Sequence, residues 1–280
     1  MANNVGSSLK KIGDKEFKLL SNYIESEVGI KLPPIKRSLL ESRLQKRLKF
    51  HNIPDFSHYC DFVFESPQGV QEVIEMIDAI TTNKTEFMRE PGHFEFMVKV
   101  ALPELVSKKN DIKLWSAACS SGQEPYNMAM FMEEFIEKNK PVRYRVDATD
   151  ISKSSLAKAQ KAVYNMADID MVSLDFKKKY FLKSKSKDNP EVRIKPNIRK
   201  NVSFKPINLI KDNYDISERY DIVFCRNVLI YFNKENQYKV ISRIVDQMNY
   251  GGYLFLGHSE SLAGLRENLV TKEASIYRKE

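Results

Sequence analysis

The spacing of apolar side chains divides the chain into a helical first part and an alternating second part. Residues 14–80 carry apolar positions at helical spacing, and Leu40, Leu44 and Leu48 form one stripe at four-residue intervals. Short turns punctuate this pattern, including one at Pro33-Pro34. The pattern predicts a small all-helical domain over residues 12–80.

A polar linker over residues 81–92, which ends in Pro91-Gly92, separates this domain from a second one over residues 93–280. Strands are predicted in the second domain at 113–116, 144–148, 202–206, 221–225, 253–256 and 275–278. Helices are predicted near 93–107, 123–138, 152–162 and 234–249. This alternation indicates an α/β fold with a mainly parallel, doubly wound sheet covered on both faces. Short charged pieces over about 177–201 interrupt it and predict an inserted β-hairpin.

Composition is that of an ordinary water-soluble protein, with 42% hydrophobic and 29% charged residues among 280. We find no apolar run long enough to cross a membrane and no apolar core of a signal peptide at the N-terminus, so a cytoplasmic location without membrane insertion is expected. The three cysteines are far apart, and the four histidines follow no metal-ligand spacing. We therefore expect neither a disulfide nor a metal site.

The net charge of +8 is concentrated in two basic blocks, residues 31–50 and 177–205. In the first block, Arg43 and Arg47 are neighbours on one helix face with Lys46 nearby. Such a cationic helix suits an anionic partner, and we assign these three residues to substrate docking. For the lysines of the second block, a solvated surface is the simpler interpretation.

The stretch "WSAACSSGQEPY", residues 115–126, joins a predicted strand to a predicted helix through very small side chains. Such a turn could hold a nucleophile, cradle a phosphate or make room for a flat cofactor. The chain has no GxGxxG, no P-loop and no GxSxG motif, and no histidine base is suggested for Cys119. Asp150 ends the next strand, where a ribose-binding acid is expected. The ligand most consistent with this pattern is S-adenosylmethionine.

Six motifs in order then carry a family resemblance: "TTNKTEFMRE", "WSAACSSGQEPY", "ATDIS", "PINL", "CRNVLIYF" and "GHSESL". Together they resemble the chemotaxis receptor methyltransferases, the CheR family, over nearly the whole chain. The resemblance implies an all-helical N-terminal domain and a Rossmann-like S-adenosylmethionine-dependent methyltransferase domain. It also implies transfer of methyl groups to glutamate carboxylates of chemoreceptors, with S-adenosylhomocysteine as the product.

The resemblance also implies roles for single residues. Asn83, Thr85 and Arg89 close over the cofactor, Glu124 binds its methionyl or amino end, Asp150 binds the ribose, Asn208 and Leu209 surround the adenine, and Arg226 with Asn227 completes the pocket. Arg89 and Tyr231 are the positions closest to the reacting methyl and the substrate carboxylate, and are the expected catalytic residues.

Each of these residues also has a purely structural interpretation. Asp150 could cap the following helix, and Glu124 could be a first-turn acid favoured by the helix dipole. Tyr231 could be a half-buried ring with a wet hydroxyl, and Arg89 could pair with Glu86 or Glu90 at the surface.

Two other functions compete with receptor methylation. The basic blocks are compatible with a nucleic-acid methyltransferase, but residues 227–231 read "NVLIY" rather than the Asn/Asp-Pro-Pro-aromatic motif of amino-methylating enzymes. An interleaved basic and aromatic stacking platform is also missing, so we expect no nucleic-acid partner. The third possibility is a non-catalytic sensor that binds S-adenosylmethionine, against which the presence of both Arg89 and Tyr231 counts.

The predicted hairpin bears on how receptors are recognised. Family members that grip a peptide at a receptor's C-terminus carry glycines in the hairpin loop, whereas "FLKSKSKDNPEVRIKP" has none. Lys183, Lys185 and Lys187 crowd the strand before the turn, and lysines on an edge strand tend to block strand addition. We expect recognition through the receptor methylation helices, without a C-terminal tether.

Overall fold

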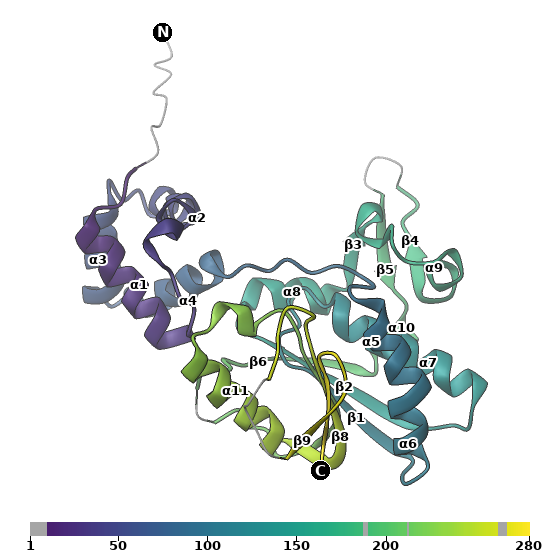
Figure 1. Cartoon of the computed structure of the whole chain (residues 1–280). Helices are drawn as coiled ribbons and strands as arrows, with labels where there is room; N and C mark the ends of the chain where they lie inside the picture. The colour runs from purple at the N-terminus through teal and green to yellow at the C-terminus, as the bar shows by residue number, and fades with distance from the viewer. Residues whose placement is uncertain (1–9, 187–189, 212, 263–267) are drawn as a thin grey trace. The chain divides into compact units, whose positions relative to one another are not determined.

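The computed structural model describes residues 10–186, 190–211, 213–262 and 268–280 (Figure 1). The chain divides into two compact units, Met1–Thr82 and Asn83–Glu280. This fold confirms the expected class: a helical unit followed by an α/β unit with a mostly parallel sheet.

The first unit is built from helices. Its elements are α1 (Asp14–Val28), η1 (Pro34–Lys36), α2 (Arg37–Phe50), α3 (Phe56–Glu65) and α4 (Gly69–Ile80). The stripe Leu40, Leu44 and Leu48 is buried in the core of the unit, as its spacing predicts. The helix ends follow local rules: Gly29 adopts the left-handed conformation after α1, and the Asp55 carboxylate caps α3.

The second unit contains a seven-stranded sheet and a separate three-stranded sheet. The strands are β1 (Asp111–Ser116), β2 (Arg143–Asp150), β3 (Val163–Asn165), β4 (Phe181–Lys183), β5 (Glu191–Ile194), β6 (Val202–Pro206), β7 (Tyr220–Cys225), β8 (Met248–Leu256), β9 (Leu269–Glu273) and β10 (Ile276–Lys279). The helices are α5 (Pro91–Phe96), η2 (Met97–Ala101), α6 (Leu102–Val106), α7 (Gln123–Lys138), α8 (Lys153–Lys161), η3 (Met166–Ile169), α9 (Leu174–Tyr180), α10 (Pro196–Arg199), η4 (Leu229–Tyr231) and α11 (Lys234–Asp246).

The large sheet has the order β6-β2-β1-β7-β8-β10-β9. Its first five strands are parallel, and β10 and β9 add to one edge in antiparallel pairing. Side chains alternate between two buried faces, as expected of a parallel sheet with helices on both sides. Along β7, Ile222 and Phe224 face α5 and α7, whereas Val223 and Cys225 face α11.

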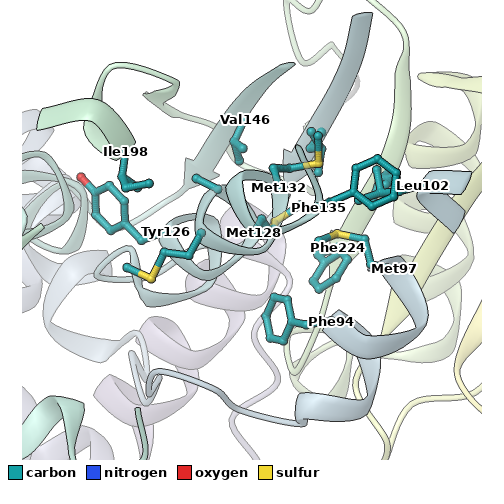
Figure 2. Close-up of a cluster of buried hydrophobic side chains, with 14 of the residues drawn as sticks. Phe94, Met97, Leu102, Tyr126, Met128, Met132, Phe135, Val146, Ile198 and Phe224 are labelled. Atoms are coloured by element: carbon teal, nitrogen blue, oxygen red, sulfur yellow. The ribbon is translucent and has the colours of Figure 1, made fainter. Parts of the chain in front are cut away.

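Each face has its own apolar core. Figure 2 shows the first, where Phe94, Met97, Met128, Met132 and Phe224 pack together between the helices and the sheet. The second core contains Trp115 of β1, whose indole N–H donates to Thr149 Oγ1 at 3.0 Å. Side chains of β1 and β7 thus pack into a core on each face of the sheet, which holds both strands in place.

The inserted hairpin is present but is part of a larger element. β4 and β5 pair antiparallel within 177–201, and β3, which the sequence did not predict, pairs with β5 to complete the order β3-β5-β4. β4 is thus an edge strand. Lys183 ends it and Lys185 is exposed, whereas Lys187, Asp188 and Asn189 lie outside the described residues.

Several details differ from the predicted elements. The helix expected over 93–107 contains a π-helical segment, η2, between α5 and α6. The helix expected to reach residue 249 ends at Asp246, because Met248–Tyr250 belong to the long strand β8. β9 was not predicted, since its residues are mostly exposed and lack a buried alternation. β2 begins one residue earlier than expected, at Arg143, and ends at Asp150.

Candidate active site

The candidate site lies at the carboxyl ends of β1 and β7. From β1 the chain runs through β2 to β6 on one side, and β7 and β8 extend the sheet on the other. The strand order therefore reverses between β1 and β7, which is where ligands bind in open α/β sheets.

The small-residue turn after β1 is fitted closely to its own surroundings. Ala117 N–H donates to Phe224 C=O at 2.8 Å, which ties the turn to β7. Gly122 has φ +94°, and a Cβ there would lie 2.8 Å from Ala159 Cβ and 3.0 Å from the Tyr164 hydroxyl. Glycine at position 122 thus leaves room for Ala159 of α8 and for Tyr164 of β3, and it permits a left-handed backbone.

Asp150 ends β2 and is buried beside this turn. Its Oδ2 accepts a hydrogen bond from Ser120 N–H at 2.7 Å, and its Oδ1 accepts one from Ser152 N–H at 2.9 Å. The N-cap of α8 is Ser152, whose hydroxyl accepts from Ser155 N–H at 3.1 Å. Asp150 is therefore not the N-cap residue, and its carboxylate instead joins the ends of two adjacent strands.

Arg226 follows β7 and links two carboxylates. Its Nη1 donates to Glu124 Oε2 at 3.1 Å, and its Nη2 donates to Glu90 Oε2 at 2.9 Å and to Arg89 C=O at 2.7 Å. Glu124, in the first turn of α7, also accepts from the Ser116 hydroxyl at 2.7 Å. The Arg226 side chain is only 1% exposed, so this charge is neutralised inside the protein by the two acids.

The electrostatics of the three groups follow from burial and this pairing. Burial raises the pKa of Glu124, and the Arg226 charge and the Ser116 hydrogen bond offset only part of that effect. Burial is also the largest single effect on Glu90, but there the Arg226 charge and the hydrogen bonds from Arg226, Asn227 and His258 together outweigh it, and the pKa is lowered. Glu90 is thus the carboxylate that Arg226 keeps most firmly ionised.

The segment before α5 contacts the site through its backbone and short side chains. Asn83 Nδ2 donates to Ser152 Oγ at 3.2 Å, and Asn83 C=O accepts from the Ser120 hydroxyl at 3.2 Å. Asn227, in a left-handed conformation with φ 58°, donates from Nδ2 to Glu90 Oε1 at 3.3 Å. Thr85 is half-buried in the same segment. These contacts bring residues 83–90 to the ends of β2 and β7.

Arg89 and Tyr231 differ from the other site residues. Arg89 is half-buried, and its Nη1 donates to Lys84 C=O at 3.0 Å. Within the described ranges its guanidinium has no carboxylate partner, so the expected alternative of a pair with Glu86 or Glu90 is not seen. Tyr231 ends η4, half-buried, and no side-chain partner of its hydroxyl is present among the residues that the structure describes.

Asn208 and Leu209 lie in the loop after β6. Leu209 is buried, and its C=O accepts from the Tyr214 hydroxyl at 2.8 Å. Asn208 is half-buried, and its Oδ1 accepts from Ile210 N–H at 3.0 Å. The pair forms a fixed turn next to the end of β2, since Ile207 N–H donates to Asp150 C=O.

Sequence reasoning missed two acids of the site. The sequence presents Glu90 only as a possible surface partner of Arg89, yet in the structure it is bonded to Arg226 and Asn227. Glu260, within the quoted motif "GHSESL", was given no role, yet it is a buried carboxylate bonded to the turn after β7. The one signal in the sequence is that each of the two acids lies inside a motif that carries the family resemblance.

Two histidines also meet at the site, which their spacing in the sequence did not indicate. The side chains of Glu90, His93 and His258 place possible ligand atoms within 4.8 Å of one another. Burial and the charge of Arg226 lower the pKa of His93 to about 4, so its ring is neutral at pH 7. Because Arg226 donates to the same Glu90 carboxylate, the local positive charge disfavours a divalent cation there.

Cys119 shows no sign of a nucleophile. Its side chain is buried, and burial raises the pKa of the thiol well above its ordinary value. A thiol in this state remains protonated and unreactive at neutral pH. Cys119 is part of the packing around the turn.

In the first unit, the expected docking residues have internal partners that the sequence did not predict. Arg47 Nε donates to Glu72 Oε1 at 2.9 Å, and Arg43 donates to Thr82 Oγ1 at 3.1 Å and to the C=O groups of Ala79 and Thr81. Both arginines thereby bind α4 and the residues after it. Lys46, between them in sequence, is exposed.

The second unit is an α/β domain of the doubly wound class, in which ligands bind at the carboxyl ends of the parallel strands, and its second strand ends in the buried Asp150 carboxylate. The chain belongs to the CheR methyltransferase family. Residues 83–277 match the model described as "CheR methyltransferase, SAM binding domain", and residues 15–81 match "CheR methyltransferase, all-alpha domain". The cofactor of the second unit is therefore S-adenosylmethionine.

Curated relatives are similar to this chain over most of its length. A chemotaxis protein methyltransferase of Borreliella burgdorferi is 35% identical, covering 94% of this chain and 94% of its own. Those of Escherichia coli and Vibrio parahaemolyticus are 32% and 37% identical, covering 95% and 91% of this chain and 91% and 92% of their own. Among solved structures, TehB from Haemophilus influenzae aligns with 66% of each chain at 14% identity and a TM-score of 0.38, from which we draw no argument.

No helix in the described part of the chain is both long and apolar enough to cross a membrane.

Proposed function

We propose that this protein transfers the methyl group of S-adenosylmethionine to glutamate side-chain carboxylates of chemotaxis receptors, forming methyl esters for chemotactic adaptation. Membership of the CheR family supports methyl transfer, and the relatives' names support a role in chemotaxis. The observation that favours a carboxylate acceptor is the pair Arg89 and Tyr231. Their polar ends have no side-chain partner among the described residues, in a site whose other charges are paired.

A carboxylate substrate needs no general base. A glutamate has an ordinary pKa of roughly 4.3, so it is already ionised at neutral pH and can act as the nucleophile directly. Glu90 and Glu124 are held by Arg226, and Asp150 is bonded to backbone N–H groups. None of these acids is placed to collect a proton, and none is needed.

The bound cofactor supplies an electrophilic methyl group on a sulfonium centre. In our proposal the chain does the rest by orientation: Asp150 binds the ribose hydroxyls, Glu124 the amino end, and Asn208 and Leu209 lie beside the adenine. Arg89 and Tyr231 align the substrate carboxylate with hydrogen bonds, and Asn83 and Thr85 help to exclude water. Arg226 and Asn227 tie residues 83–90 to the sheet through Glu90.

For receptor recognition we propose the basic helix α2. Receptor methylation helices are expected to present glutamates, so the exposed Lys46 and the partly exposed Arg43 and Arg47 would meet an acidic face. Since such helices are cytoplasmic, we place the enzyme in the cytoplasm. Because both arginines also hold α4, Lys46 is the residue at which docking can be separated from folding.

We further propose that the three-stranded sheet does not take up a receptor tether. β4 is one edge of this sheet, and Lys183 lies on it. Charged side chains along an edge oppose addition of another strand. The isolated tail peptide should therefore bind weakly, and receptors with and without their tails should be methylated equally. A micromolar affinity for the peptide together with tail-dependent methylation would overturn this.

The central experiment incubates the protein with methyl-labelled S-adenosylmethionine and either receptor cytoplasmic fragments or nucleic acid. Base-labile label on the receptor is the expected result, because glutamyl methyl esters hydrolyse in alkali. Label on nucleic acid would favour the competing methyltransferase function. Binding of the cofactor without transfer to either acceptor would favour a sensor.

A further inference from the structure

Glu260 is a buried carboxylate bonded entirely to backbone N–H groups. It is 6% exposed, and its two oxygens accept from four backbone groups. Oε2 accepts from Asn227 N–H at 2.8 Å and from Gly257 N–H at 2.7 Å. Oε1 accepts from Leu229 N–H at 2.8 Å and, more weakly, from Ile230 N–H at 3.4 Å. A single side chain thus holds most of the turn that follows β7.

This turn would be difficult to hold without an anion. Asn227 has φ 58°, a left-handed conformation that costs free energy in a residue other than glycine. Its N–H and those of Leu229 and Ile230 all donate to one carboxylate, and backbone N–H groups arranged in this way form an anion-binding site. The anion here is supplied by the chain itself, from the loop after the neighbouring parallel strand β8.

The loop around Glu260 is also built to let it reach this point. A Cβ at Gly257 would lie 2.9 Å from Glu260 Oε2 and 2.5 Å from Asn227 Nδ2. Glycine at this position therefore keeps open the space in which the carboxylate and the Asn227 side chain meet. Burial raises the pKa of Glu260, and the backbone hydrogen bonds oppose that rise.

Tyr231 follows directly after the anchored residues. Its N–H donates to Val228 C=O at 3.2 Å, which closes the short helix η4. Leu229 and Ile230 are the first two residues of this helix, so their anchoring fixes the backbone position of Tyr231, its last residue. Glu260 itself has no contact with Asp150 or Glu124 among its bonds.

We propose that Glu260 is a positioning residue for methyl transfer, which acts through the turn 227–230 to place Tyr231 against the substrate carboxylate. This inference rests on the proposed function and adds a role that the motif resemblance did not assign. It predicts that loss of Glu260 slows the chemical step while cofactor binding is retained, because the ribose and amino ends are bound elsewhere.

The test compares Glu260→Gln with the wild type, with Glu273→Gln on the exposed strand β9 as a matched control. Glutamine keeps one acceptor oxygen but turns an NH₂ group against backbone N–H groups. We expect kcat for a receptor fragment to fall at least tenfold, with the Kd for S-adenosylhomocysteine changed less than threefold and the control unchanged. A kcat within threefold of the wild type would refute the proposal.

A double-mutant cycle distinguishes positioning from general loosening of the fold. If Glu260 acts through Tyr231, Glu260→Gln should lower kcat less than threefold when it is added to Tyr231→Phe. Losses that multiply in the double variant would overturn the inference. If Glu260→Gln does not fold, Gly257→Ala, whose Cβ crowds the same carboxylate, is put through the same cycle with the same criteria. If the wild type itself did not methylate receptor, the proposed function would be wrong. A role of Glu260 in positioning Tyr231 is refuted separately, by the kcat values of the single and double variants.

Discussion

Arg226 and Glu124 form a buried ion pair, with Nη1 and Oε2 3.1 Å apart, that joins the end of β7 to the first turn of α7. The same guanidinium binds Glu90, so one arginine ties the segment before α5, the end of β7 and the first turn of α7 together. Assembly of the site and stability of the second unit therefore depend on the same contacts.

Replacing Arg226 by methionine should destabilise the protein strongly. The change leaves Glu124 and Glu90 without their buried counter-charge, and removing one partner of such a pair costs about 3–5 kcal/mol. Urea unfolding followed by circular dichroism measures the change. Lys239→Met, which removes one partner of an exposed pair on α11, is the control and should cost less than about 1 kcal/mol. An Arg226→Met loss as small as the control's would mean that the acids are solvated.

Replacing Asp150 by alanine should weaken cofactor binding more than folding. A ribose that loses charge-assisted hydrogen bonds loses about 2 kcal/mol, or roughly thirtyfold in affinity. Calorimetric titration with S-adenosylhomocysteine checks this.

Ser152→Ala provides the comparison for Asp150, since it removes the N-cap of α8 and leaves the acid in place. It should cost about 1 kcal/mol of stability, and because it also removes the acceptor of Asn83 Nδ2 it should lower the affinity, but less than Asp150→Ala does. Unchanged affinity in a folded Asp150→Ala protein would assign the acid to holding the strand ends alone.

Lys46→Glu should raise the KM for receptor, because a charge at the edge of an interface mainly affects the rate of association. It should leave the melting temperature unchanged, because Lys46 is exposed. The wild-type rate should fall with added salt. Arg43→Ala is the contrasting variant and should lower stability, since it frees the C=O groups of Ala79 and Thr81. Normal methylation by Lys46→Glu at low salt would contradict docking at this helix.

The helical unit should lose stability in acid through Glu72. Burial alone would raise the pKa of this carboxyl, but hydrogen bonds from Arg47, Tyr59 and His51 more than offset it, and the pKa is lowered. An acid with a lowered native pKa stabilises the fold above its ordinary value of 4.5, and the contribution is lost as the pH falls through the lowered value. Melting curves from pH 7 to 3 should show this loss in the wild type and a flatter profile in Glu72→Gln.

The sequence predicted the parts of the fold that bury alternating apolar residues. β7 and α7 begin and end close to where the pattern placed them, because their burial is unbroken. β3 escaped prediction because it is short and pairs with the distant strand β5, and β9 because its residues are mostly exposed.

The sequence predicts the site residues that lie in the ordered motifs. It does not predict contacts between residues that are distant in sequence and close only in the folded protein. Asp150 and Glu124 lie at strand and helix ends that the pattern located. Glu90 meets Arg226 across 136 positions, and an acid next to Arg89 in sequence gives no sign of burial. The internal partners of Arg43 and Arg47 were missed for the same reason, since a basic ridge on a helix reads alike whether it faces solvent or α4.

Trp115, buried on β1, is the one tryptophan in the chain. Its emission therefore reports on the sheet that carries the site, and the helical unit, which has tyrosines but no tryptophan, contributes nothing to that signal. With excitation selective for tryptophan, the unfolding of the second unit can thus be followed apart from that of the helical unit in the unlabelled, full-length protein.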